Sequence, residues 1–204
     1  MMGKTHMIAG AATVAGFYYL TTGHVDVPLV IIGATSALLP DIDHPKSTIN
    51  QKSVLLGIIG LFYRLILNIF AFIYSIPVYI LRKMGIKIPD LSSGHRGPLT
   101  HGFVGLLIFG IMFSFIIPYG MDFYVSILLG IASHIFVDML NPEGVPLAWP
   151  FYGKYIRLLP KFLTIKTNSI LEKTFSFSTM IVLTFIFYDL FYIESINFIN
   201  NFQF

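Results

Sequence analysis

The sequence contains no cysteine and few charged residues. Without cysteine the chain forms no disulfide and offers no thiolate to a metal, so histidine and carboxylate side chains are the remaining ligands. Charged residues make up 11% of the 204 residues and hydrophobic residues 55%, whereas an ordinary soluble domain carries about 25% charged residues. The composition therefore predicts an integral membrane protein, and the length allows one membrane-embedded helical domain over residues 1–204.

Five apolar segments are predicted to be membrane-spanning helices, which makes the expected fold an all-α polytopic membrane helical bundle. They cover residues 6–22, 27–40, 101–118, 122–140 and 176–194. The first two are short and rich in small residues, so we expect them to form a tightly packed hairpin.

The hydrophobic insert over residues 54–90 admits two interpretations. It is long enough to cross a bilayer, but Arg64 and Asn68 interrupt it and Pro77 favours a bend. A single crossing would place the polar residues before and after the insert on opposite faces of the membrane. We therefore expect a re-entrant or interfacial helical hairpin, broken near Arg64 or near Pro77.

Lysine and arginine are absent from three segments that this topology places on one side. These are the turns 23–26 and 118–122 and the tail 195–204. Because basic loops remain in the cytoplasm, the rest of the loops are predicted to face it, including a loop over residues 141–175. The expected location is the cytoplasmic membrane, multi-pass. This topology also accounts for the sequence pI near 9, so no nucleic-acid partner is expected.

Five of the six histidines lie in four short polar clusters that interrupt the apolar sequence. Ionisable groups in or beside apolar spans are costly, and they generally mark a functional site. On the topology above, all four clusters lie at the cytoplasmic face of the membrane. The clusters are Lys4–His6, Pro40–Pro45, His95–His101 and Ser133–Asp138.

The clusters supply six candidate metal ligands. His134 and Asp138 are spaced i, i+4, so both project from one helix face, although a simple hydrogen-bonded pair at a helix end would use the same spacing. Asp41 and His44 lie in a proline-bounded turn that suits a cation; the alternative is a helix cap by one carboxylate. The six candidate ligands are His6, Asp41, His44, His101, His134 and Asp138.

Three further residues are candidates for catalysis. A guanidinium beside a metal pairs with two phosphate oxygens, which is the role expected of Arg96; the alternative is a basic anchor at the membrane face. Asp43 and His95 are each expected to accept a proton from water or to orient a ligand; the alternatives are that Asp43 bridges two ions and that His95 is itself a ligand. His24 lies alone in the turn on the opposite side, where we expect an ordinary exposed residue.

These residues resemble the YdjM family of membrane-bound, metal-dependent hydrolases. The resemblance implies a hydrolase with a His/Asp metal site. More distantly, the pattern is similar to zinc-dependent phospholipase C and the zinc single-strand nucleases, which are all-helical phosphoesterases using more than one zinc. This chain lacks a second H-x-x-x-[DE] helix of the kind they carry. The resemblance runs through Thr5-His6, Leu39–Pro45, His95–Gly97, Thr100-His101, Ser133-His134, Asp138 and Asn141–Pro146.

The expected function is hydrolysis of a lipid-linked or other phosphoester at the cytoplasmic membrane face by a metal-dependent enzyme. The expected cofactor is a divalent metal, either zinc at one to three ions per chain or manganese, and the expected partner is a membrane lipid or lipid-linked substrate. Two other classes stay open: a metal-stabilised scaffold without catalysis, and a metal-ion transporter. A transporter needs polar residues that continue to the opposite face, and beyond the clusters the spans carry few.

Overall fold

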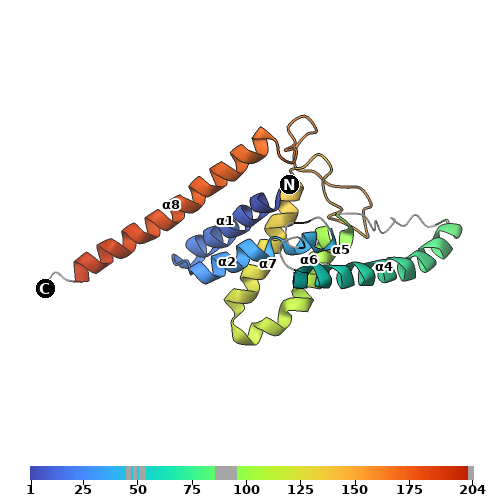
Figure 1. Cartoon of the computed structure of the whole chain (residues 1–204), viewed down its shortest axis with the longest axis horizontal. Helices are drawn as coiled ribbons and strands as arrows, with labels where there is room; N and C mark the ends of the chain where they lie inside the picture. The colour runs from blue at the N-terminus through green and yellow to red at the C-terminus, as the bar shows by residue number, and fades with distance from the viewer. Residues whose placement is uncertain (45–46, 48–49, 51–53, 86–95, 202–204) are drawn as a thin grey trace.

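The computed structural model describes residues 1–44, 47, 50, 54–85 and 96–201, and these residues form an all-helical protein (Figure 1). Within them, the residues outside the helices form turns and one long loop before the last helix, with an isolated antiparallel β-bridge between Val145 and Ile156. In chain order the elements are α1 (Gly3–Thr22), α2 (Val27–Ser36), the 3-10 helix η1 (Leu39–Asp43), α4 (Val54–Lys83), α5 (Pro98–His101), α6 (Phe103–Phe113), the 3-10 helix η2 (Ser114–Tyr119), α7 (Met121–Asp138) and α8 (Ile170–Asn201).

The five predicted segments are helical, but two of them are interrupted. Among the described residues only Met121–Asp138 and Ile170–Ile193 of the five are long and apolar enough to cross a membrane. The helix expected over 27–40 ends at Ser36, and the 3-10 helix η1 follows it. The helix expected over 101–118 is divided at Gly102, where the backbone is extended and the Phe103 N–H donates to the Leu147 carbonyl at 3.0 Å. This bond connects the α5–α6 junction to the loop that follows α7.

Helices α1 and α2 form the expected tight hairpin. The turn begins at Gly23, which adopts a left-handed φ of 68° that favours glycine. Farther along, Gly10 lies against the Gly33 carbonyl and Ala37, so that a Cβ at position 10 would overlap both. Gly130 brings α7 equally close, because a Cβ there would overlap the Gly33 carbonyl and the Ser36 hydroxyl. The three helices therefore pack backbone to backbone.

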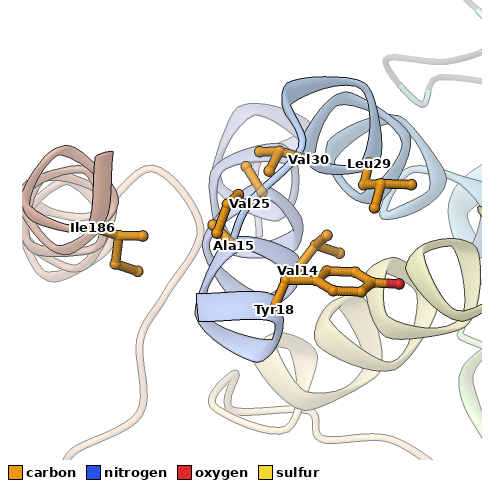
Figure 2. Close-up of a cluster of buried hydrophobic side chains, with 8 residues drawn as sticks. Val14, Ala15, Tyr18, Val25, Leu29, Val30 and Ile186 are labelled. Carbon is orange, nitrogen blue, oxygen red and sulfur yellow. The ribbon is translucent and has the colours of Figure 1, made fainter. Parts of the chain in front are cut away.

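The apolar core fills the space around these close contacts. Figure 2 shows one cluster, in which side chains of α1 face those of α2 and the turn between them, and Ile186 approaches from α8. Tyr18 of this cluster also donates from its hydroxyl to Asp122 at the start of α7. A second cluster joins α6 and α7 to the following loop; its members are Phe109, Ile127, Ile131, Ile135, Met139 and Val145.

The hairpin expected in residues 54–90 is wrong, because α4 is one uninterrupted helix from Val54 to Lys83. Arg64 and Asn68, which suggested a break, are four residues apart and therefore share one helix face. Pro77 is accommodated within the helix. The final residues of the expected hairpin, 86–90, lie outside the described residues.

Three helices are long and apolar enough to cross a membrane among the described residues: Gly60–Lys83, Met121–Asp138 and Ile170–Ile193. Two shorter apolar segments, Val27–Ile42 and Phe103–Tyr119, accompany them. In Figure 1, α4 and α8 extend away from the group formed by α1, α2 and α7 in opposite directions. The first six residues of α8 had been expected in the loop 141–175, which therefore ends earlier than predicted.

We expect Gly10→Ala to lower the thermal midpoint of the detergent-solubilised protein, because the new methyl group must push α1 away from α2. Overpacking of this kind costs about 1–3 kcal/mol. Gly16→Ala in the same helix is the matched control, since nothing lies within 4 Å of a Cβ there. It should raise stability slightly, because alanine favours a helix over glycine by about 0.5–1 kcal/mol. Equal midpoints for the two variants would contradict close packing at Gly10.

Candidate metal centre

Four segments far apart in the sequence bring ionisable side chains to one buried place. His6 comes from the first turns of α1, Asp41 from η1, His101 from the end of α5, and His134 and Asp138 from the last turns of α7. The three histidines and Asp138 are at most 1% exposed, and Asp41 is 15% exposed. Burying so many polar groups is unfavourable unless they bind one another or a ligand.

The backbone of α2 fixes the orientation of His134. Its Nδ1–H donates to the Ala37 carbonyl oxygen at 2.6 Å. A carbonyl only accepts, so the proton must lie on Nδ1, and a neutral imidazole then has its lone pair on Nε2. A hydrogen bond from the second ring nitrogen to a carbonyl is the arrangement that normally orients a metal-binding histidine.

Thr100 orients His101 in the same way. Its hydroxyl lies 2.8 Å from the His101 Nδ1 and 3.2 Å from the Gly97 carbonyl. The contact at Nδ1 directs the Nε2 of His101 into the cluster.

The two Nε2 atoms face each other at 3.1 Å. Asp41 Oδ1 lies 3.5 Å from the Nε2 of His101 and 3.6 Å from that of His134. Asp138 Oδ2 lies 3.9 Å and 3.8 Å from the same two nitrogens. Acceptor atoms therefore converge from four side chains, and such a group is stable only when a cation or shared protons lie among them.

His6 completes the cluster from the α1 side. Its ring stacks on that of His134, with centroids 3.8 Å apart and an interplanar angle of 17°. Its Nε2 lies 3.4 Å from Asp138 Oδ1, and its Nδ1 is buried with no hydrogen-bond partner in the part of the chain that the structure describes. His6 therefore has an unsatisfied ring nitrogen within the centre.

Arg96 binds Asp138 rather than projecting into open space. Its Nε lies 2.7 Å and its Nη2 3.3 Å from the two carboxylate oxygens of Asp138, and its Nη1 lies 2.7 Å from Glu143. The Arg96 backbone has a left-handed φ of 67°, which is uncommon for a residue with a side chain. Asn141 donates a further hydrogen bond to Asp138 at 3.0 Å. These contacts fix the Asp138 carboxylate in one orientation.

Two sets of three ligand atoms lie close enough together to hold an ion: His6, His134 and Asp138, and Asp41, His101 and His134. Within each set the ligand atoms are within 4.8 Å of one another. Because Nδ1 of His134 is bound to a carbonyl, its single free lone pair can serve only one cation. Nitrogen and carboxylate oxygen ligands of this kind fit zinc, and also manganese.

The other predicted site residues fall outside these two sets. His44 lies directly after η1, where its carbonyl accepts from Asn50 at 2.8 Å. The Asp43 side chain and the whole of His95 lie outside the described residues, so their catalytic roles stay predictions. His24, expected to be an ordinary surface residue, is 64% exposed and pairs with Asp26 at 3.0 Å.

Sequence reasoning missed the residues that support the centre. Glu172, at the start of α8, is fully buried and accepts from the Met2 N–H at 2.6 Å and the Thr5 hydroxyl at 2.9 Å. These bonds hold the first turn of α1, and with it His6. A lone glutamate at the edge of an apolar segment was the only signal in the sequence. Asn141 and Glu143 had been noted only as part of a family pattern.

Comparison with known proteins gives matches over most of the chain. The family model described as YdjM inner membrane protein matches residues 1–196. The protein YvsG of Bacillus subtilis is 29% identical over 195 residues, which are 94% of this chain and 98% of YvsG. The inner membrane protein YdjM of Escherichia coli is 32% identical over 128 residues, covering 61% of this chain and 48% of that protein. No solved structure matches the chain.

We expect His101→Ala to lower the metal content of the purified protein, measured by elemental mass spectrometry. His101 contributes a ligand atom that no neighbouring side chain can replace. His24→Ala is the control, because that imidazole lies in the exposed turn at the other end of α1. Thr100→Val should lower the affinity for the metal about 10–100-fold, because it removes the contact that orients the ring of His101 without removing a ligand. Equal metal content in His101→Ala, His24→Ala and the unmodified protein would rule out the centre.

Proposed function

The chain belongs to the YdjM family of inner membrane proteins, and we propose that it is a membrane-bound metal-dependent hydrolase that cleaves a phosphoester. The observation that carries the proposal is the approach of the Nε2 atoms of His101 and His134 to 3.1 Å, beside the carboxylates of Asp41 and Asp138. Each ring is oriented by a contact at its Nδ1, with the Ala37 carbonyl for His134 and with the Thr100 hydroxyl for His101.

The chemistry of the donor set suits a divalent cation. His6, Asp41, His101, His134 and Asp138 would hold it, and each is oriented by its own helix or by a hydrogen bond. When bound, such a cation lowers the pKa of water and draws negative charge from a phosphoryl oxygen. The carboxylate of Asp41, the least buried member, is positioned to accept a proton at the open side of the centre.

The exposure of Asp41 favours an enzyme over a scaffold. A structural metal site is closed by protein ligands on all sides, whereas a catalytic site keeps one position accessible to water or substrate. Four of the five residues are buried, each at most 1% exposed: His6, His101, His134 and Asp138. Asp41 alone of the five is partly exposed. Substrate would therefore approach across η1.

The location of the centre favours a substrate that resides in the membrane. Its ligands lie at the ends of apolar helices rather than in a separate soluble domain. The positive-inside distribution of lysine and arginine supports a site at the cytoplasmic face. We therefore propose a lipid-linked phosphoester as the substrate class.

We expect the purified protein to hydrolyse a chromogenic phosphodiester or phosphomonoester, to lose this activity with a chelator, and to regain it with zinc or manganese. Asp41→Asn should reduce turnover to the background, because an amide is a weaker ligand and a poorer proton acceptor than a carboxylate. Asp26→Asn is the matched control at the exposed turn. If metal-loaded protein is inert toward lipid, nucleotide and generic phosphoesters, the non-catalytic scaffold becomes the better description.

The proposed orientation can be tested with single cysteines, because the natural chain has none to interfere. A cysteine replacing Lys161 should react with an impermeant thiol reagent only from the cytoplasmic side. A cysteine replacing Asp122, at the opposite end of α7, should react only from outside. The reverse pattern would place the metal centre at the outer face.

A further inference from the structure

Helix α4 packs against η1, the element that carries Asp41. Its N-terminal half packs on η1, so closely that a Cβ at Gly60 would lie 2.9 Å from the Ile42 carbonyl. The Asn50 amide donates to the same carbonyl at 3.0 Å. Ile42 directly follows Asp41, the one partly exposed member of the centre. A substrate that reaches Asp41 across η1 must therefore pass along α4.

Arg64 lies one helical turn beyond Gly60, on the same face of α4. Its Nη1 is buried and has no hydrogen-bond partner in the part of the chain that the structure describes. Arg96, by contrast, is bound to Asp138 and Glu143. A buried guanidinium nitrogen without a hydrogen-bond partner is costly, and an anion is a natural partner for it.

Farther along the same helix is a half-open cavity of about 640 Å³. It is lined by Ala71, Tyr74, Ser75, Ile76, Val78, Tyr79, Ile80 and Arg82. This volume is typical of a site for a small organic ligand. Tyr74 forms part of its wall and contacts Trp149, with ring centroids 5.3 Å apart. Most of the wall area is apolar, and Arg82 lies at the far end of the lining, so the cavity suits a hydrocarbon chain better than a sugar or a nucleotide.

The opposite face of α4 is apolar and exposed. Its side chains recur every three or four residues, as in a helix that contacts lipid on one side. Helix α4 therefore has η1 on one side and an apolar exposed surface on the other. The exposed side chains include Ile58, Phe62, Leu65, Ile69 and Phe72.

We propose that α4 binds a phosphorylated amphiphile, with the phosphate at Arg64 and the hydrocarbon chain in the cavity over residues 71–82. This inference rests on the proposed function, because it assigns the substrate of the same centre. A phosphate bound to Arg64 would lie one helical turn from the contact between Gly60 and η1. The hydrocarbon chain of the ligand would then follow the helix axis toward Trp149.

The chain has a single tryptophan, Trp149, which makes the test direct. The metal-loaded full chain in detergent is titrated with phosphatidic acid whose acyl chains are brominated, because bromine quenches a nearby indole. We expect saturable quenching. Brominated diacylglycerol, which lacks the phosphate, should bind at least about tenfold more weakly, as expected for loss of a charged hydrogen bond. Inorganic phosphate should compete for Arg64 without quenching.

Variants separate the two parts of the site. Arg64→Met should lower the affinity for phosphatidic acid about tenfold and leave the affinity for diacylglycerol unchanged. Arg157→Met is the control, because it makes the same change of charge at an exposed arginine. Arg64→Lys keeps the charge and should bind with intermediate affinity, which guards against misfolding of the methionine variant. Ala71→Phe fills the cavity and should reduce the maximal quenching. Ile73→Phe, on the exposed face, should not.

Quenching that rises without saturation, or equal affinity for the two brominated lipids, would overturn this inference. Metal-dependent hydrolysis of a soluble phosphoester together with either result would leave the proposed function in place. Saturable binding that depends on Arg64, in a protein inert toward all phosphoesters, would instead support the lipid site and reject the hydrolase.

Discussion

The metal centre depends on the close approach of three helices at Gly33. Gly10 of α1 and Gly130 of α7 both lie against the Gly33 carbonyl, at a spacing that leaves no room for a Cβ. One helical turn from these glycines toward the site are His6 on α1 and His134 on α7, about 6 Å along each axis. On α2 the same step reaches the carbonyl that binds His134. Glycine packing thus sets the distances within the centre.

The orientation of the histidines then creates an electrostatic requirement. The Nδ1 proton of His134 leaves its Nε2 lone pair facing the Nε2 of His101 at 3.1 Å, so a proton or a cation must lie between the two nitrogens. Asp41 and Asp138 add negative charge at the same point. Arg96 offsets part of the charge of Asp138, but it approaches from the side of Glu143. A divalent cation between the histidines and the carboxylates would satisfy all of these groups together.

The sequence was sufficient to predict most of the helices, though not the continuous helix α4, and most of the candidate centre, because both leave local signals. Short polar clusters in apolar sequence identified His6, Asp41, His101, His134 and Asp138, which the fold brings together. The supporting contacts could not be predicted. Arg96 meets Asp138, and Glu172 meets Thr5, across long separations in sequence, and no local pattern specifies such pairs. The hydrogen bond from His134 to the main-chain carbonyl of Ala37 could not be predicted either, because it does not depend on the side chain at position 37.

The prediction for residues 54–90 started from a correct constraint but gave a hairpin where the structure has the single helix α4. The expectation that the residues on either side of the insert belong to one site is supported, since Asp41 and His101 lie 3.5 Å apart. A hairpin is not needed to satisfy it. A single continuous helix of 30 residues, about 45 Å long, starts beside η1, where Gly60 meets the Ile42 carbonyl, and Asp41 still meets His101. The polar clusters therefore converge through the packing of η1 against α5 and α7, and no turn within the insert is required.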